Sequence, residues 1–403
     1  MRSKKIIAII LLLLTALLFS CSGTETAENA EETKVIENAL TFEMSFGADE
    51  LILPDEYLLS RPQTFDVDED GNFIVFDEDK VKVYDKDGEP KTSFGRQGQG
   101  PGEFGSVQSL SVNKEGYLTV VNDVSGYNLY DPDYKYIDSK NYRSDPECSE
   151  LIKNYSFNFM VREIFSLNAD QRVFHFDSFK DVENNVNRVV ADGLIFEDNG
   201  TFREIVLYYP EYSDNLQSIG GGSNWSILIL PNQAKILWDI LPDNKIIYTN
   251  PAFDKQEIKG ISSVVLHILD LETFEFSQII HEYTPVEIKE SLNTGNYTES
   301  SEERIKRTSE NLKYFNPLHE LLTDDNFIFL VPLKFYMFGF KIDVKKDFPI
   351  EVIDAETGKQ LCTANFPFIP SIIKNGYAYR RNRDPEGFSI IERYRIDPKV
   401  YGK

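Results

Sequence analysis

Apolar and polar positions along this chain repeat one pattern: an apolar strand, an acidic turn and a second apolar strand. The clearest copy runs from Phe65 to Val75 around the turn Asp70-Gly71, and a second copy begins 45 residues later at Leu110, around Glu115-Gly116. Alternation of apolar and polar residues is typical of strands with one buried face. Because Asp, Asn and Gly tolerate the positive φ that tight hairpins require, each copy predicts a β-hairpin.

Six such hairpins can be placed along the chain, and most are followed by a second one. The turns of the first hairpins are Asp70-Gly71, Glu115-Gly116, Asp170-Gln171, Asp243-Asn244, Asp325-Asn326 and Asn375-Gly376. The turns of the second hairpins are Asp87-Gly88, Pro132-Asp133, Asn199-Gly200 and Thr357-Gly358. Two hairpins supply four strands, and strand-built repeats of about 40 to 50 residues are typical of propeller blades. The pattern therefore predicts an all-β fold, a six-bladed β-propeller over residues 39–403.

The sixth copy is short of one strand. After the apolar run Ile390–Ile396 the chain ends within a few residues, whereas the segment Ala39–Phe46 at the other end of the domain is apolar and has no partner. An unpaired strand edge invites aggregation, and pairing these two segments would remove it. We therefore expect the N-terminal strand to complete the last blade.

Residues 285–316 interrupt the β pattern. Glu303 stands three residues after Ser300, as in a capping box, and Glu302 and Lys306 form a favourable i, i+4 pair. These features predict a short helical insertion between copies four and five, with the helix over about residues 301–312. It is either a charged surface insertion or a lid or docking element over one face of the ring.

The first 20 residues predict an export signal. A basic start is followed by the apolar run Ile6–Leu18, which is too short to span a bilayer comfortably. Leu18-Phe19-Ser20-Cys21 resembles the lipobox of bacterial lipoproteins, which implies lipid attachment at Cys21 and an outer-membrane lipoprotein facing the periplasm or the cell surface. The alternative is an ordinary cleavage site. Residues 21–38, acidic and without aromatics, are expected to form a flexible tether.

The charge of the chain restricts its partners. With 66 acidic and 42 basic residues the net charge is −24, and loss of the three signal cations lowers it to −27. Such a charge argues against nucleic acid or anionic lipid as a binding surface. The expected partners are the membrane, through the N-terminal lipid, and a protein or small ligand on one propeller face. Arg380, Arg381 and Arg383 form a basic cluster that could face an anion.

A glycine-rich segment carries a family resemblance. Gly98, Gly100, Pro101, Gly102 and Phe104 stand in the order of the inter-blade signature of NHL-repeat propellers. The segment resembles most the six-bladed propeller lipoproteins of Gram-negative bacteria. Asp77 and Gly116 also match, Asn122 stands where the family has Asp, and the signature covers about residues 60–140. The resemblance implies the fold; it assigns no activity, because propellers host unrelated functions.

Catalytic and metal-binding signals are weak. Asp66 to Gly71, with Asp77 at the twelfth position, resembles a calcium loop, but the flanking helices of that motif are missing. The acids are therefore interpreted as solvated, structural turn residues, whose removal by Asp66→Ala with Asp68→Ala should cost little. The four histidines show no His-x-His or His-x-x-x-His spacing, and no Gly-x-Ser-x-Gly elbow is present. Cys148 and Cys362 fall on separate blades and are expected as two thiols.

These observations predict a binding or scaffolding module of the cell envelope without a cofactor, not an enzyme. Two alternatives stay open. The first is an enzyme of the lactonase or lyase type, with a metal in the central channel held by residues of different blades. The second is an accessory or sensor lipoprotein of a nutrient-uptake complex.

Overall fold

The computed structural model describes residues 33–48, 53–122, 126–142, 144–147, 150, 158–182, 186–208, 235–285, 314, 316–332 and 347–403. The chain divides into two units, residues 1–34 and Val35–Lys403. Of the first unit, only residues 33 and 34 are described, and they form no regular structure. The second unit contains all the strands.

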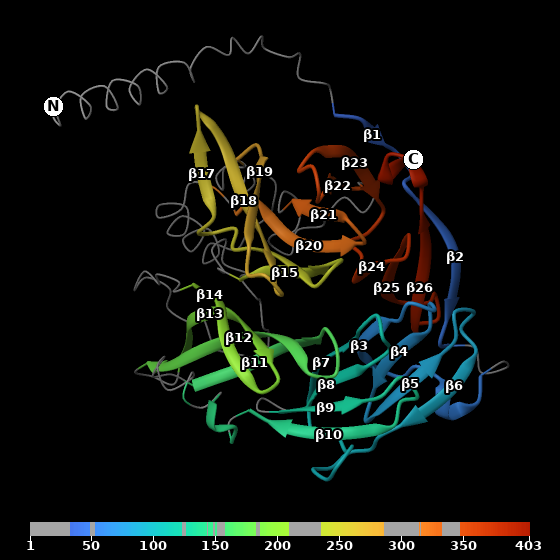
Figure 1. Cartoon of the computed structure of the whole chain (residues 1–403). Coiled ribbons are helices and arrows are strands. Elements are labelled where there is room, and N and C mark those ends of the chain that lie inside the picture. The colour runs from blue at the N-terminus through green and yellow to red at the C-terminus, as the bar shows by residue number, and fades with distance from the viewer. Residues whose placement is uncertain are drawn as a thin grey trace, which may run out of the picture. The chain divides into compact units, whose positions relative to one another are not determined.

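Val35–Lys403 is a six-bladed β-propeller built from six separate sheets (Figure 1). Blades 1 to 3 each have four antiparallel strands that follow one another in the chain. Blade 1 contains β3 (Pro62–Val67), β4 (Phe73–Asp77), β5 (Lys80–Tyr84) and β6 (Pro90–Phe94). Blade 2 contains β7 (Val107–Val112), β8 (Leu118–Asn122), β9 (Gly126–Tyr130) and β10 (Tyr136–Asn141). Blade 3 contains β11 (Asn158–Ser166), β12 (Gln171–Val182), β13 (Val186–Asp198) and β14 (Thr201–Tyr208).

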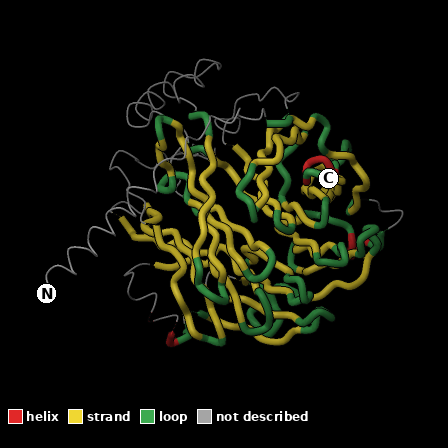
Figure 2. Tube along the Cα trace, turned by 45° about the horizontal axis from the view of Figure 1, so that its top comes forward, coloured by secondary structure: helices red, strands yellow, loops and turns green. Residues whose placement is uncertain are grey.

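Blades 4 to 6 depart from this plan. Blade 4 contains β15 (Leu237–Leu241), β16 (Lys245–Thr249), β18 (Ile261–Asp270) and β19 (Phe276–Glu282), with the short β17 (Lys255–Ile258) paired to the start of β18. Blade 5 contains β20 (Leu318–Asp324), β21 (Phe327–Pro332), β22 (Phe348–Asp354) and β23 (Gln360–Phe366). Blade 6 contains β24 (Ile372–Lys374), β25 (Tyr377–Arg383) and β26 (Ser389–Ile396). Strands dominate the described backbone in Figure 2, and the 3-10 helices η1 (Asp55–Tyr57) and η4 (Pro398–Tyr401) are single turns.

The predicted hairpins are confirmed. All six predicted turns join the first and second strand of a blade, and the four predicted second turns join the third and fourth strands. The backbone shows why these residue types stand there: Gly71 and Gly116 have φ of +82° and +85°, and Asp243 and Asn244 have φ of 58° and 54°. Only glycine and, less often, Asn or Asp adopt such angles readily.

The N-terminal segment completes two blades. As predicted, β2 (Leu40–Phe46) pairs antiparallel with β26 and forms the outermost strand of blade 6. In addition, β1 (Val35–Ile36) pairs parallel with β23 at the outer edge of blade 5. The fold therefore begins at Val35, and assigning residues 35–38 to the tether was wrong. This boundary could not be found from the sequence because a strand of two residues carries no periodicity.

The apolar core lies between the blades. The described residues form six clusters of buried side chains, and each cluster combines residues of two neighbouring blades, one for every boundary around the ring. In the cluster between blades 5 and 6, Ile36 and Ala39 from the N-terminal segment pack with Phe329, Val352 and Ile396. Burial of β1 in this cluster is the physical reason that it belongs to the fold.

Several sequence predictions fall on residues outside the described part. These are the signal, Cys21, Cys148 and the helix over about residues 301–312. Cys362 is described; it is a buried thiol whose Sγ lies 3.5 Å from the carbonyl oxygen of Val400. In the described part of the chain, no helix has the length and apolar character required to cross a membrane.

Candidate functional site: the central channel

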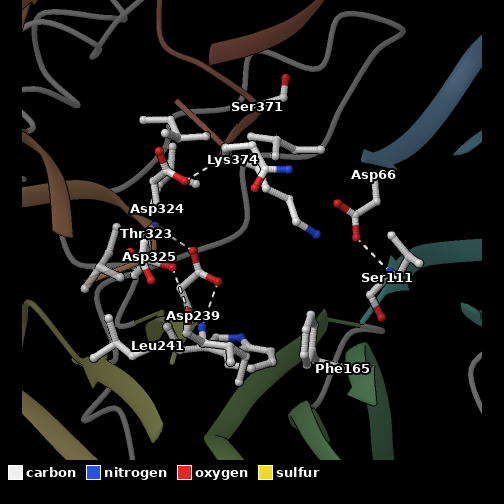
Figure 3. A pocket seen from close by; sticks show the side chains of 18 of the residues that line it. Asp66, Ser111, Phe165, Asp239, Leu241, Thr323, Asp324, Asp325, Ser371 and Lys374 are labelled. Atoms are coloured by element: carbon white, nitrogen blue, oxygen red, sulfur yellow. Dashed lines mark hydrogen bonds between the residues drawn. The ribbon is translucent and has the colours of Figure 1, made fainter. Parts of the chain in front are cut away.

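A cavity of about 870 Å³ lies in the middle of the ring, and residues from the first strand of every blade line it. Figure 3 looks into this cavity: Asp66 and Ser111 stand opposite Asp324 and Asp325, with Asp239 and Phe165 between them. Seven acidic side chains (Asp66, Glu69, Glu163, Asp239, Glu320, Asp324, Asp325) and five basic ones (Lys114, Lys235, Lys374, Arg381, Lys403) are among the lining residues.

Asp66 connects blade 1 to blade 2 at the channel wall. One carboxylate oxygen accepts the backbone N–H of Val112 at 2.8 Å, and the other accepts that of Val67 at 2.7 Å. Burial raises the pKa of Asp66, while the charge of Lys374 acts in the opposite direction. The side chain is thus a structural bridge that also carries charge at the cavity.

Asp239 connects blade 4 to blade 5 at the channel wall in the same way. Its carboxylate oxygens accept the backbone N–H of Ile240 and that of Thr323, each at 2.8 Å, and the Thr323 hydroxyl donates back to the Ile240 carbonyl at 2.8 Å. Burial raises the pKa of Asp239 to about 7 despite these donors, and the negative charge of Glu163 adds to the rise. A carboxyl group with such a pKa in a cavity is a common mark of a functional site.

Every other blade boundary is also crossed by a polar side chain. Bridging contacts are Ser111 Oγ to Ile164 O (2.6 Å), Asp192 Oδ2 to Ile236 N (2.6 Å), Asp324 Oδ1 to Asn375 N (2.7 Å) and Ser389 Oγ to Ser60 O (3.1 Å). These contacts satisfy backbone groups that the sheets leave unpaired. Much of the polarity near the axis therefore serves to hold neighbouring blades together.

Glu163 and Glu320 do not take part in this bridging. Both line the cavity, and neither forms a hydrogen bond or ion pair with another residue in the described ranges. Glu163 is open to the cavity but enclosed by the surrounding blades, and this desolvation raises its pKa. His175 and Lys235 lower this pKa, whereas the charges of Glu320 and Asp66 raise it further. These two carboxylates are free to contact a ligand.

The predicted arginine cluster is not assembled as one surface. Because side chains alternate along β25, Arg380 points to the opposite face from Arg381 and Arg383. Arg380 pairs with Glu392 and lies 4.1 Å from the ring centroid of Phe368. Arg381 donates to the carbonyls of Pro62, at 2.8 Å, and Gln63, and Arg383 donates to that of Gly387 at 2.9 Å. Of the three, only Arg381 lines the cavity.

The acidic residues of blade 1 that resemble a calcium loop lie in three different environments. Asp66 faces the channel, whereas Asp68 accepts the backbone and side-chain N–H groups of Asn72 at 2.8 and 2.7 Å inside the hairpin. Asp77 forms a buried ion pair with Lys82 at 2.7 Å. Asp68 and Asp77 are buried, so their interpretation as solvated was wrong, although both have structural roles.

A group with metal-ligand character lies in blade 3. Ligand atoms of His175, Asp177 and Asp192 lie within 4.8 Å of one another, and this is the one such set among the residues that the structure describes. The groups are already engaged: His175 Nε2 lies 2.8 Å from Asp192, and Arg162 pairs with Asp177. The sequence could not reveal this set, because Asp192 of β13 joins His175 and Asp177 of β12 only through the pairing of the two strands.

The glycine-rich segment has a structural role. Gly95 has a φ of +85°, and a Cβ there would clash with the ring of Phe104. Phe104 is buried and packs against Phe76 of blade 1 at 5.4 Å between ring centroids. The carboxylate of Glu103 accepts the backbone N–H of Gly100 at 2.8 Å. These residues fold the connection between blades 1 and 2 over Phe104, as expected for an inter-blade segment.

Comparison with known proteins supports the fold. Residues 50–219 match a family model described as a 6-bladed beta-propeller. No curated protein matches this chain. A solved structure from Bacteroides fragilis NCTC 9343, provisionally named an exported protein, shares 13% identity with a TM-score of 0.50 and covers 90% of this chain and 99% of its own.

Two further structures are more distant. A chain of the Mitotic Checkpoint Complex shares 10% identity, covering 93% of this chain and 98% of its own, with a TM-score of 0.40. The Pan2 WD40 domain of Neurospora crassa shares 8%, covering 90% and 97%, with a TM-score of 0.39. With the six sheets described above, the family model and the Bacteroides structure identify the fold: this protein is a six-bladed β-propeller.

Proposed function

We propose that this protein is an exported, lipid-anchored β-propeller of the cell envelope that binds a small ligand, or a side chain of a protein partner, in its central channel. The observation that carries this proposal is the cavity of about 870 Å³, in which Glu163 and Glu320 have no partner among the described residues. Cavities of roughly 300–1,000 Å³ are the usual size of small-molecule sites.

The rigidity of the channel wall favours binding. The first strand of every blade lines the channel, and side chains such as Asp66 and Asp239 connect such a strand to the next blade. A site built on rigid strands loses little conformational entropy when a ligand enters. The cavity is therefore suited to recognising a ligand of defined shape.

Export and anchoring are supported by the N-terminal sequence. The basic start, the apolar run Ile6–Leu18 and the lipobox-like segment ending at Cys21 follow one another in the order that a lipoprotein signal requires. The Bacteroides fragilis structure, named as an exported protein, is compatible with this location. We propose lipid attachment at Cys21, with the segment up to Lys34 as the tether.

One observation favours a second candidate, an enzyme that uses channel carboxylates as acid and base. The pKa of Asp239 is about 7, and the charge of nearby Glu163 contributes to it. A group with a pKa near neutrality can both donate and accept a proton. Turnover in a screen of lactones and esters, lost in a Glu163→Gln variant, would favour the enzyme over the binding module.

The channel proposal is tested by filling the cavity. Thr64 lines it, three residues before the end of β3, and Thr64→Trp would place an indole in the channel without removing a bridging contact. A library of cationic, neutral and anionic small molecules is screened by thermal shift against the purified protein and this variant. Ligands that stabilise the protein and are lost in the filled variant support the proposal. The absence of any channel-dependent ligand, or hits that persist in Thr64→Trp, would contradict it.

A further inference from the structure

We propose that the channel ligand is a small protonated amine that also carries hydroxyl or carbonyl oxygens; this inference rests on the proposed function. The residues that support it form one tier of the channel wall. Ser109, Glu163 and Trp238 each stand three residues before the last residue of their strand, β7, β11 and β15, and Glu320 stands four before the end of β20. All four line the cavity, and they come from the consecutive blades 2 to 5.

The two glutamates in this tier provide acceptors for a cation. Neither has a hydrogen-bond or ion-pair partner within the described ranges, and both belong to the same cavity. The charge of Glu320 disfavours ionisation of Glu163, so the two carboxylates repel each other. An ammonium group has three N–H donors and would relieve this repulsion by pairing with both.

Two other atoms of the tier point to a ligand independently of the acids. Trp238 Nε1 and Ser109 Oγ are buried and have no hydrogen-bond partner among the described residues. A buried polar group without a partner is unfavourable, so such groups are rare in folded proteins. Both residues line the cavity, so a ligand bound there can supply the missing partner. An indole N–H only donates, so the ligand must supply an acceptor.

The balance of charge around the tier favours a cation. Glu163 is within electrostatic reach of Asp66, Asp239 and Glu320. His175 and Lys235 oppose the negative surroundings of Glu163, and Lys374 acts in the same way on Asp66, while its Nζ lies 3.7 Å from the carboxylate of Glu69. The four carboxylates thus face two lysines and His175, and of these basic groups Lys374 already pairs with Glu69 and His175 with Asp192. The rings of Trp238 and Phe165 also line the cavity and can stabilise a positive charge.

The experiment compares amines with neutral analogues of the same shape. Binding to the purified protein is measured by calorimetry at pH 6.5 for D-glucosamine against D-glucose, and for 1,4-diaminobutane against 1,4-butanediol, with D-glucuronate as the anionic analogue. We expect at least one amine to bind about tenfold or more tightly than its neutral analogue, a difference expected of one charge-assisted contact.

Substitutions within the tier test whether its side chains bind the amine. Glu163→Gln and Glu320→Gln preserve side-chain shape and should each weaken amine binding about tenfold without changing the thermal unfolding temperature appreciably. Glu386→Gln, in an exposed turn of blade 6, is the matched control and should bind amines like the unmodified protein. Trp238→Phe keeps the ring but removes the donor, and should weaken glucosamine more than diaminobutane.

Three results would overturn the inference: neither amine exceeds its neutral analogue, glucuronate binds more tightly than glucosamine, or both glutamine variants bind amines normally. The failure of this inference is separable from that of the proposed function. If a neutral or anionic compound binds and is lost in Thr64→Trp, the channel is a binding site for a ligand of another class. If no compound of any charge depends on the channel, the proposed function itself is wrong.

Discussion

Asp66 in blade 1 and Asp239 in blade 4 make the same pair of hydrogen bonds at their respective blade boundaries. Each carboxylate accepts the N–H of the residue that follows it and an N–H from the first strand of the next blade, that of Val112 or that of Thr323. Both side chains also line the channel. The assembly of the ring and the chemistry of its cavity therefore depend on the same residues.

Replacement of Asp66 should be more costly than the sequence suggests. Asp66→Ala leaves the N–H groups of Val67 and Val112 without their acceptor, and an unsatisfied buried donor costs about 1–3 kcal/mol. We expect the free energy of unfolding in urea to fall by an amount in this range. Glu69→Ala, a neighbouring cavity acid with an exposed side chain, serves as control and should have little effect. Equal stability of the two variants would show that the bridge contributes nothing.

Removal of N-terminal residues should destabilise the ring in two steps. A mature chain shortened to begin at Val35 keeps β1 and β2 and should unfold like the full mature chain. A chain that begins at Ala39 loses the pairing of β1 with β23 and the burial of Ile36, and should melt at a lower temperature. A chain that begins at Phe46 also exposes the edge of β26 and should aggregate. The same melting temperature for all three chains would contradict closure by these strands.

The parts of the fold that could be predicted from the sequence are those determined by residues close together in the chain. The six hairpins were predicted because Asp, Asn and Gly occupy the tight turns, and closure was predicted because the sixth copy lacked one strand. The channel site was missed because its residues share no motif: Ser109, Glu163, Trp238 and Glu320 are brought together only by the ring.

The predicted arginine cluster is a case in which the sequence suggested a grouping that the structure does not contain. Arg380, Arg381 and Arg383 are neighbours in sequence, but a strand turns alternate side chains to opposite faces. One partner is also distant in the sequence: Arg381 donates to Pro62 in blade 1, which becomes a neighbour only when the ring closes. Adjacency in sequence therefore indicated a common surface for all three side chains, whereas the β geometry places only Arg381 and Arg383 on the same face.

The lipid anchor predicts where the protein is found. Cys21→Ala should move the protein from the membrane fraction to the soluble fraction, since acyl chains contribute roughly 0.8 kcal/mol for each buried CH₂ group. Cys362→Ala is the control: this thiol is buried in the propeller, so its loss should leave the protein with the membranes. Fractionation with a salt wash and immunoblotting measures both. A Cys21→Ala protein that still sediments with membranes after the wash would show that another contact holds it there.

The pKa of Asp239 predicts how stability depends on pH. The folded-state pKa of about 7 lies above the ordinary aspartate value of 3.8, so between about pH 4 and pH 7 the folded protein retains a proton that the unfolded chain has released. Stability increases with pH only where the unfolded state binds more protons; here the folded state binds more, so the contribution of Asp239 falls as the pH rises through this window. Asp239→Asn removes the titrating group while keeping one acceptor oxygen.

The stability of the Asp239→Asn variant relative to the unmodified protein should therefore increase as the pH rises. Relative to the unmodified protein, the unfolding free energy of Asp239→Asn should rise by about 1–4 kcal/mol between pH 4 and pH 8, because each tenfold difference in proton affinity between the folded and unfolded states corresponds to about 1.4 kcal/mol. Urea unfolding at intervals of one pH unit measures the difference. Asp325→Asn, an exposed acid of the same cavity, should show no such trend. If the two variants follow the same pH dependence, the proton retained by the folded protein is not on Asp239, and its hydrogen bonds to Ile240 and Thr323 hold an ionised carboxylate throughout this range.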